Sequence, residues 1–343
     1  MFPVRTMLAV DGGASKADLA LVDVEGRVFA AARRPGTYHF GLGYNGSLEA
    51  LTRAVDLVAR RAHAGLNGSP LAQVGVFCLA GADLSIDDRR IAAELEAQRW
   101  TTTTLVRNDT FAVLRAGTDR KWGVAVVYGT GMNCAGVGPD GRSVRFPSFG
   151  ELSGDRAHGG GWLGRAALGA AIRARDGRGP RTILEDLVPA HFKMSRPTAV
   201  MEAVYVGKLK YGRLSEVAPV VFKAAAAGDA VASGMIDLLV DEIVVTVNAA
   251  VRRLHLTRSD VHIVLGGGVL QAAGKELLGR IRDGIRTVAP RAEIRQLEAP
   301  PLVGAALIGL DAMGASPDAR KRIRRTLTHA RLNRTTPRRA KRS

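Results

Sequence analysis

The sequence predicts a mixed α/β protein built from two similar domains, because one arrangement of short strands and glycine turns occurs twice. Residues 8–32 form three strand-like segments joined by the turns DGGASK and VEGR. Residues 123–146 repeat that order, with the turns GTGMN and PDGR. Alternating apolar and small residues are typical of strands, and recurrence of a whole meander indicates an internal duplication. With 343 residues, the chain is long enough for two domains that each bury a core.

Each meander is followed by segments expected to complete a sheet and to cover it with helices. After the first meander these are a helix over 48–66, a strand over 74–81, a helix over 87–98 and a strand over 102–109. In the second half they are a long helix over 229–256, a strand and glycine turn over 261–270, a strand over 292–297 and a helix over 303–313. We therefore expect an N-terminal domain over 1–115, a C-terminal domain over 116–300, and a helix near 301–316 that packs back onto the first domain.

The net charge of +17 is concentrated near the C-terminal end. Residues 319–343 hold eleven Lys or Arg and no acidic residue. A segment of this composition repels itself and has little to bury, which predicts a disordered basic tail. Such a tail is either solvated or a contact for a polyanion. The rest of the chain is only mildly basic and is not expected to read DNA.

The cysteines and the hydropathy pattern indicate a cytoplasmic protein. Only Cys78 and Cys134 are present, both in apolar segments, so neither a disulfide framework nor a CxxC metal site is expected. Asp11 interrupts the first apolar run, where a signal peptide would continue. No later run reaches the ~18 to 20 apolar residues of a membrane span. The apolar helix over 229–256 makes a homodimer the expected assembly.

Three glycine-rich turns, at 11–16, 129–131 and 266–268, each follow an apolar strand. Glycine lets the backbone approach phosphate oxygens, and neighbouring N–H groups can bind an anion, so the three turns together indicate a nucleotide site. The segment nearest to a Walker A loop, GVLQAAGKE, has five residues between its glycines and an acid after its lysine. The first turn leads into a strand and not into a helix, which excludes a Rossmann fingerprint.

Three segments resemble the nucleotide motifs of the actin, hexokinase and heat-shock ATPase superfamily, in the same order: AVDGGASKADLALVD, VAVVYGTGMNCAGVG and VHIVLGGGVL. The segments FCLAGAD, VRNDTFAVLRAG and FGELSGDRAHGGGWLG add a resemblance to the N-acetylglucosamine kinase branch of the BadF/BadG/BcrA/BcrD ATPase family, over roughly residues 7–315. The resemblance implies a duplicated actin-like (ribonuclease H-like) ATPase core with an interdomain cleft. It also implies ATP and Mg²⁺ as cofactors.

The nucleotide residues follow from this resemblance. Asp11 would hold hydrated Mg²⁺, which agrees with the preference of that ion for one or two carboxylates beside phosphate oxygens. Thr130 would offer its hydroxyl to the phosphates from the second domain. The positions assigned to the phosphates are Gly12, Gly13, Ser15, Lys16, Gly129, Thr130 and Gly131, and those assigned to the adenosine are Gly266 and Gly267.

Transfer of a phosphoryl group to an alcohol needs a carboxylate that accepts the proton of the attacking hydroxyl. Asp109, at the end of a predicted strand, occupies the position of this base in the family. Without the resemblance, Asn108-Asp109 would be read as a helix N-cap, and Asp83 as the cap of the helix over 87–98. The resemblance implies sugar contacts from Thr37, His39, Gly81, Asp83, Asn108, Asp109, Gly150 and Asp155.

Two loops depart from the family pattern, and both belong to the expected acceptor site. Residues 36–41 read GTYHFG where the family usually carries an asparagine. Residues 154–159 read GDRAHG where the family has Gly-Asp-Glu-Gly-Ser. His39 and His158 are therefore candidate sugar ligands.

The resemblance implies an ATP-dependent sugar kinase whose acceptor is an amino sugar, with N-acetylglucosamine or glucosamine as the first candidates. A second hypothesis is an ATPase of the same family that activates a CoA-ester dehydratase through an iron–sulfur cluster shared across a dimer. This chain has no cysteine just ahead of Gly-Thr-Gly, where that activity would lead us to expect one. A third hypothesis is a non-catalytic nucleotide- or sugar-binding module that uses the basic tail.

Overall fold

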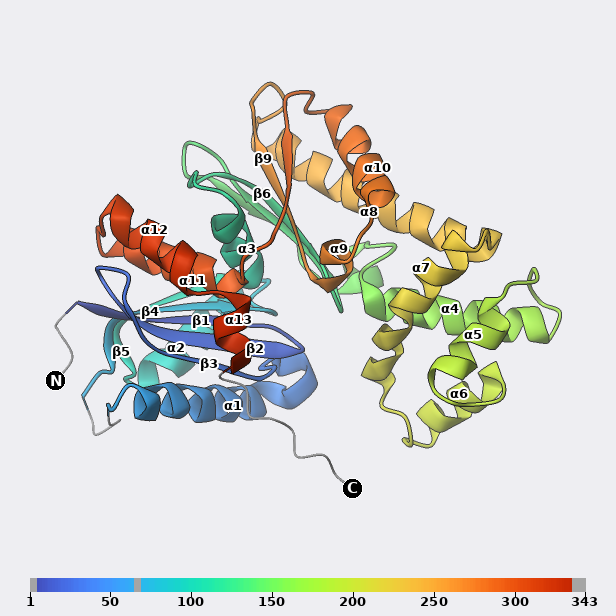
Figure 1. Cartoon of the computed structure of the whole chain (residues 1–343), viewed down its shortest axis with the longest axis horizontal. Helices are drawn as coiled ribbons and strands as arrows, with labels where there is room; N and C mark the ends of the chain where they lie inside the picture. The colour runs from blue at the N-terminus through green and yellow to red at the C-terminus, as the bar shows by residue number, and fades with distance from the viewer. Residues whose placement is uncertain (1–4, 65–68, 335–343) are drawn as a thin grey trace.

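A computed structural model describes residues 5–64 and 69–334, without the side chains of residues 39–41. Two five-stranded sheets organise the described chain, one in each half of the sequence (Figure 1). The first sheet has the spatial order β3 (Val28–Pro35), β2 (Lys16–Asp23), β1 (Thr6–Gly12), β4 (Ala72–Leu79) and β5 (Thr101–Asn108). The second has the order β10 (Glu293–Gln296), β9 (His262–Gly266), β6 (Gly123–Tyr128), β7 (Met132–Val137) and β8 (Ser143–Arg145).

Both sheets have the same topology. In the first, the antiparallel meander β1-β2-β3 is extended by β4 and β5, which run parallel to β1. In the second, the antiparallel meander β6-β7-β8 is extended in the same way by β9 and β10. The duplicated α/β architecture that the repeated glycine turns predict is therefore confirmed.

Helices cover both faces of the first sheet. Alternate residues of a strand point to opposite faces, so Leu8 and Val10 of β1 pack with α1 (His39–Arg61), while Met7 and Ala9 pack with α11 (Pro301–Ala312). Two further helices follow strands of this sheet, α2 (Ser85–Ala97) after β4 and α3 (Asp109–Gly117) after β5. Because helices bury the side chains on both faces of β1, nearly all the residues of this strand are apolar.

Helix α1 begins at His39, earlier than the position 48 that the sequence predicts. The three glycines at 41, 43 and 46 favour a loop on propensity alone. At Gly43 the helix is kinked, because the φ of 70° and ψ of 163° of this residue are not helical. Ser47 Oγ also donates to the carbonyl oxygen of Thr37, which ties the first turns to the strand end before them.

The second domain carries a larger set of helices. Helix α8 is the long apolar helix expected over 229–256, and it packs on β6 and β7. Helices α4 to α7 project beyond the sheet (green and yellow in Figure 1). The helical segments are η1 (Gly150–Ser153), α4 (Gly160–Arg175), α5 (Leu184–His191), α6 (Pro197–Tyr205), η2 (Tyr211–Val217), α7 (Ala218–Ala226), α8 (Ala230–Arg253), α9 (Gly268–Gln271) and α10 (Lys275–Arg286). No helix among the described residues is long and apolar enough to cross a bilayer.

The chain returns to the first domain after β10. Helix α11 packs against α3, β1 and β4. The expected boundary at 115/116 falls inside the last turn of α3, so we propose the segment 118–122 between α3 and β6 as the division between the domains.

The expectation of a disordered tail over 319–343 is wrong for residues 319–334. Two helices, α12 (Pro317–Thr326) and α13 (His329–Arg334), continue the fold along the first domain (red in Figure 1). Their apolar residues recur at helical spacing and are buried in the same core as α11: Ala319, Ile323, Leu327 and Leu332. The many arginines dominate the composition of this segment and hide the pattern. They do not interrupt the apolar stripe, because their long stems can lie beside it while their charged heads stay in water. Residues 335–343 lie outside the described residues, and a polyanion contact there stays a prediction.

Candidate active site

A cleft of about 1010 Å³ lies between the domains and takes residues from both. It is lined by the turn after β1, by the ends of β4 and β5, by the turn after β6 and by the turn after β9. The structure therefore brings together most of the residues that the sequence predicts, namely Asp11, Gly13, Ser15, Lys16, Gly81, Asp83, Asp109, Gly129, Thr130, Gly131, Gly150 and Gly267.

Some predicted site residues do not line this cleft. Asn108 and Gly12 lie behind it, and a Cβ on Gly12 would come within 2.5 Å of Leu79 and 2.6 Å of Thr37, so this glycine is required by packing. Asp155 accepts a hydrogen bond from Ser153 in its own loop. Gly266 ends β9, with its Cβ direction facing Val113. The side chain of His39 lies outside the described part of the structure.

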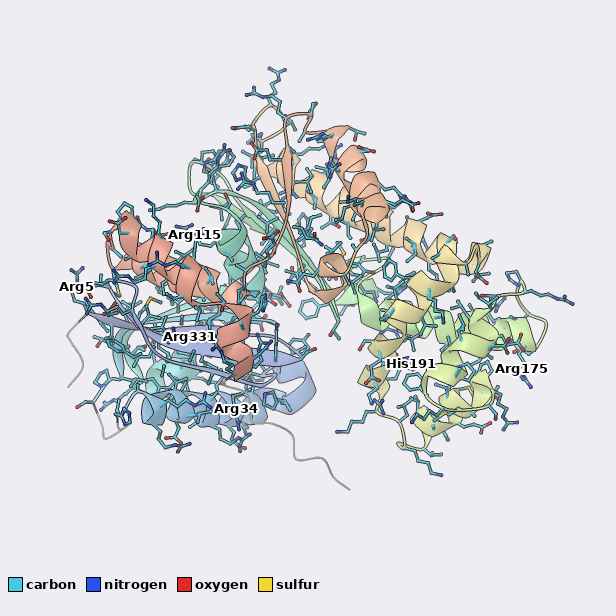
Figure 2. The ribbon with its side chains drawn as sticks, in the orientation of Figure 1. Arg5, Arg34, Arg115, Arg175, His191 and Arg331 are labelled. Atoms are coloured by element: carbon cyan, nitrogen blue, oxygen red, sulfur yellow. The ribbon has the colours of Figure 1, made fainter. Side chains whose placement is uncertain are left out.

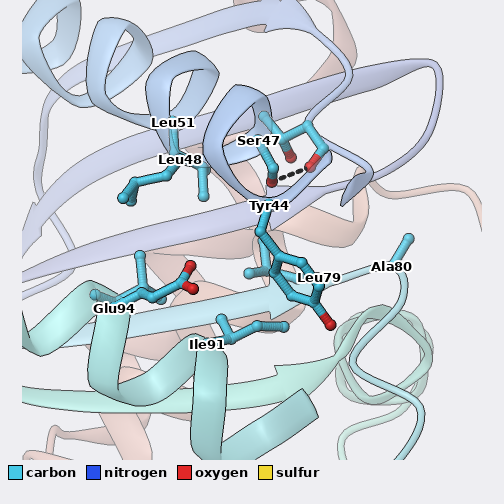
Figure 3. Close-up of a pocket in the computed structure, with 10 residues that line it drawn as sticks. Tyr44, Ser47, Leu48, Leu51, Leu79, Ala80, Ile91 and Glu94 are labelled. Atoms are coloured by element: carbon cyan, nitrogen blue, oxygen red, sulfur yellow. Dashed lines mark hydrogen bonds between the residues drawn. The ribbon is translucent and has the colours of Figure 1, made fainter. Parts of the chain in front are cut away.

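Thr37 lines a second and much smaller cavity of about 20 Å³ beneath α1 (Figure 3). Tyr44 and Ser47 from α1 and Ile91 and Glu94 from α2 surround it. A space of this size holds a single water molecule. Direct sugar binding by Thr37 is thus not supported by its place in the fold, and the residue instead packs under the first turn.

The two glycine hairpins meet across the cleft. The hydroxyls of Ser15, from the first domain, and Thr130, from the second, are 3.3 Å apart. Each hairpin is closed by its own backbone hydrogen bond, from Gly13 N to Lys16 O and from Gly129 N to Gly131 O. Two such turns that face one another with hydroxyls, glycine amides and a lysine form a setting suited to a chain of phosphates.

Asp11 stands at the end of β1 and is only 7% exposed. Burial raises the pKa of its carboxyl well above the usual range, and the negative charges of Asp18 and Asp109 raise it further. Asp18 lies opposite Asp11 on β2 and is neutralised by Arg33, which donates to both of its oxygens at 2.7 and 2.8 Å. Asp11 has no such partner of its own in the described chain. A buried carboxylate crowded by like charges fits a divalent cation such as Mg²⁺.

Asp109 is the first residue of α3, directly beyond β5. The helix is capped by Asn108, whose side-chain oxygen accepts from the backbone N–H of Thr110 at 3.0 Å. The capping role that the sequence left open for this pair therefore belongs to Asn108, and Asp109 is left to line the cleft. Burial, and then the charge of Asp83, raise the pKa of Asp109 to about 7.

Asp83 is a buried carboxylate held from both domains. Its Oδ1 accepts a hydrogen bond from Asn108 of β5 and another from Asn133 of β7, each at 2.8 Å. It does not cap α2, because Asp87 accepts from the backbone N–H of Leu84 at that helix end. Burial raises the pKa of Asp83 to about 6 even though the two amides oppose the shift.

Sequence reasoning missed two residues at this end of the cleft, Asn133 and Tyr38. Asn133 stands two residues after the Gly-Thr-Gly turn, so its place in the second phosphate motif was the available signal. Tyr38 lines the cleft, and burial and then the charges of Asp83, Asp109 and Asp87 raise the pKa of its phenol to about 12. For Tyr38 the available signal was its place in the loop 36–41, which the sequence assigns to the acceptor site.

His158 also lines the cleft, and its imidazole lies close to Gly150, 2.8 Å from where a Cβ on that glycine would stand. Its Nε2 is 3.1 Å from Glu151 Oε1 and 3.1 Å from a guanidinium nitrogen of Arg165. The imidazole is thus engaged by two charged neighbours in the loop and α4. A sugar contact from this loop stays a prediction.

The far end of the cleft is apolar and is formed by the turn after β9 and by two helices. Gly267 has a φ of 91°, which disfavours any residue with a side chain. The walls here come from Phe222 of α7 and from Leu277 of α10, with Pro219 and Ala273 beside them. An apolar slot next to a glycine turn suits the purine ring of a nucleotide.

Replacing Gly267 with alanine should lower the affinity for ATP at least about tenfold, which corresponds to about 1.4 kcal/mol. The new Cβ would come within 2.5 Å of backbone atoms of Tyr128, so the turn after β9 would have to move. Isothermal titration calorimetry with ATP measures the effect. Gly279→Ala in α10 is the matched control, because no atom lies within 4 Å of its Cβ position. Wild-type affinity in the Gly267 variant would exclude this turn from the nucleotide site.

The fold is shared with solved structures over nearly the whole chain. A protein assigned as an N-acetylglucosamine kinase from Chromobacterium violaceum has a TM-score of 0.67 at 23% identity, covering 89% of this chain and 99% of that chain. A ROK family glucokinase from Streptomyces griseus, solved with glucose and AMPPNP, has a TM-score of 0.55 at 17% identity, covering 88% and 98%. These similarities establish the class of the fold, a duplicated actin-like ATPase core with a cleft between two domains, as the sequence predicts.

Sequence comparison narrows the class to one family. The chain is 25% identical over 321 residues to the N-acetyl-D-glucosamine kinase of Dictyostelium discoideum, covering 89% of this chain and 97% of that protein. It is 24% identical over 307 residues to the N-acetylmuramic acid/N-acetylglucosamine kinase of Clostridium acetobutylicum, covering 89% and 98%. The model of the BadF/BadG/BcrA/BcrD ATPase family matches residues 8–309. The chain therefore belongs to the BadF/BadG/BcrA/BcrD ATPase family.

Proposed function

We propose that the protein is an ATP-dependent sugar kinase that transfers the γ-phosphoryl group to a hydroxyl of an amino sugar, with N-acetylglucosamine or glucosamine as the acceptor. One observation carries the proposal. The cleft holds two facing phosphate-type hairpins at Ser15 and Thr130, and beyond them a pair of buried carboxylates, Asp109 and Asp83. The names of the two sugar kinase relatives support the choice of acceptor.

Each part of the cleft then has a role in phosphoryl transfer. The apolar slot beyond Gly267 would bind the adenine ring, and the hairpins would hold the phosphates through backbone N–H groups. Asp11 would hold a hydrated Mg²⁺ ion, which would neutralise charge on the phosphate oxygens. Ser15, Lys16 and Thr130 would orient the terminal phosphate toward the acceptor end of the cleft.

Asp109 would act as the base. Its pKa of about 7 is close to physiological pH. At that pH about half of the carboxyl groups are deprotonated, and the carboxylate is basic enough to accept a proton. Asp83 would bind a sugar hydroxyl through Oδ2, since its Oδ1 already accepts from two amides. The protonated phenol of Tyr38 would donate to a sugar oxygen on the same side.

The activator hypothesis is not favoured by the placement of the cysteines. Cys78 on β4 and Cys134 on β7 are both fully buried and lie in the cores of different domains. Burial raises the pKa of both thiols, which disfavours the thiolate that a cluster needs as a ligand. A cluster shared across a dimer would require thiols that reach the surface.

Measurement of ADP release with a panel of sugars tests the proposed function. N-acetylglucosamine or glucosamine should raise the rate of ADP release at least about tenfold above the basal rate, because the acceptor completes the site and excludes water. Neutral hexoses serve as the comparison set. A flat response to all the sugars, with ATP still bound, would reject the kinase and favour a non-catalytic module. The expected homodimer and cytoplasmic location stay predictions.

A further inference from the structure

The segment that joins the two domains also ends the helix that presents Asp109. Helix α3 begins at Asp109 in the cleft and ends at Gly117, and the chain reaches β6 of the second domain at Gly123. The last carbonyl groups of a helix have no partner inside the helix. Whatever satisfies them at this point fixes both the helix and the first bend of the interdomain segment.

Arg324 of α12 fulfils that role. Its guanidinium donates to the carbonyl oxygens of Ala116 at 2.6 Å, Thr118 at 2.8 Å and Arg115 at 3.2 Å. It also lies 3.1 Å from a carboxylate oxygen of Asp119, and its side chain is only 27% exposed. One side chain from the C-terminal helices thus binds the end of α3 and the start of the connection to the second domain.

The connection itself is fastened to the second domain. Thr118 Oγ1 lies 2.6 Å from Nδ1 of His262 in β9. Arg120 donates to the carbonyl oxygen of Asp260 at 2.7 Å and pairs with its carboxylate at 2.8 Å. Arg324 therefore joins an element that rests on the first domain to a segment that is bound to the second.

Helix α12 is held firmly enough to transmit this restraint. Asp311 of α11 pairs with Arg115 of α3 at 2.9 Å and with Arg320 of α12 at 2.8 Å. Ile323 is fully buried beside them. Arg331 of α13 donates to the carbonyl oxygen of Val28 on the first sheet at 3.0 Å. Figure 2 shows Arg115 where α3 meets the C-terminal helices and Arg331 above the first sheet.

We propose that Arg324 is a positioning residue that sets the angle between the domains and, through α3, the approach of Asp109 to the phosphate hairpin of the second domain. The catalytic half of this inference rests on the proposed kinase function, whereas the restraint on the interdomain segment does not. The C-terminal helices would thus restrain the domain movement that brings acceptor and nucleotide together.

Hydrogen–deuterium exchange tests the restraint without any substrate. In the full-length protein, Arg324→Ala should raise the exchange rate of peptides spanning residues 109–122 about tenfold, since a charged donor to three carbonyls is lost. Arg324→Lys should give an intermediate rate, because an ammonium keeps the charge and lacks the planar fork. Arg325→Ala is the matched control, since Arg325 is the next residue of the same helix and is exposed. It should leave exchange unchanged.

Kinetics test the positioning role. Arg324→Ala should lower kcat for sugar phosphorylation about five- to tenfold and leave ATP affinity within about twofold, because the residue touches neither ligand. Wild-type exchange at 109–122 in a folded Arg324→Ala protein would overturn the proposal, as would lower thermal stability with unchanged kcat. If the alanine variant is insoluble, wild-type exchange and kcat in Arg324→Lys would overturn it instead. If the wild-type chain phosphorylates no sugar, the kinase proposal fails, and the exchange result alone decides the restraint.

Discussion

Replacing Asp109 with asparagine should lower sugar phosphorylation roughly 10²- to 10⁴-fold while ATP binding and the fold survive. Asparagine keeps the size of the side chain and removes the group that accepts the proton. Helix α3 is not expected to suffer, because its cap is Asn108 and not Asp109. Turnover, ATP affinity and thermal unfolding of the same variant together measure the effect.

The control is Asp237→Asn on the surface of α8, which removes one negative charge from a side chain that is 58% exposed and should leave turnover unchanged. The alternative role for Asp109 predicts a different pattern. If the residue only supported the helix end, the asparagine variant would turn over at nearly the wild-type rate. That result would remove Asp109 from the mechanism and leave the ATP site untouched.

The pKa of about 7 at Asp109 gives this prediction a signature in pH. A base must be deprotonated, so kcat/KM of the wild type should fall about tenfold for each pH unit below 7. The folded-state pKa lies above the ordinary value of about 3.9, so the carboxyl favours the fold while protonated and this contribution is lost as pH rises through 7. Asp109→Asn should consequently raise the melting temperature relative to the wild type at pH 8, and much less at pH 5.

Removal of the C-terminal helices should destabilise the protein severely. A chain that ends at Ser316 loses Ile323, Leu327 and Leu332, which are fully buried against the first domain. Each large apolar side chain of this kind is worth about 2 to 5 kcal/mol. The truncation therefore approaches the whole stability of an ordinary domain, about 5 to 15 kcal/mol. Thermal unfolding and the yield of soluble protein measure the loss.

Two companion variants locate the effect. A chain that ends at Arg334 keeps every contact that the structure describes for α12 and α13, and it should melt like the wild type. Ile323→Ala in the full chain should alone cost about 2 to 5 kcal/mol. If the chain ending at Ser316 melted like the wild type, the apolar stripe of α12 would not contribute to the core.

The fold was largely predictable because its signals are local. The glycine turns at 11–16 and 129–131 determine where each meander reverses, and a few consecutive residues are enough to recognise them. The C-terminal helices were missed for the opposite reason. Ile323 is buried in a core that combines α11 with strands from the start of the chain, and composition within the segment says nothing of that core.

Some residues of the candidate site could be predicted from local sequence, and others could be identified only in the folded structure. Asp11 and Asp109 stand at strand ends and could be selected by position and by chemistry. The roles of Asn133 and Tyr38 emerge only from tertiary structure, which brings Asn133 to Asp83 and places Tyr38 in the same cleft. The role of the Asp18–Arg33 pair could not be predicted from the sequence either. Asp18 interrupts the apolar strand KADLALVD, and its effect on Asp11 is apparent only when the two strands lie side by side.

The shared oxygen of Asp83 constrains how the two halves of the molecule can separate. Parallel withdrawal of the domains would take Asn133 away from Oδ1 and leave a buried acceptor with one amide in place of two, at a cost of about 1 to 3 kcal/mol. A rotation with its fulcrum at Asp83 keeps both amides in place. The hairpins at Ser15 and Thr130 would then move apart, so the cleft should open more at the proposed nucleotide end than beside Asp83.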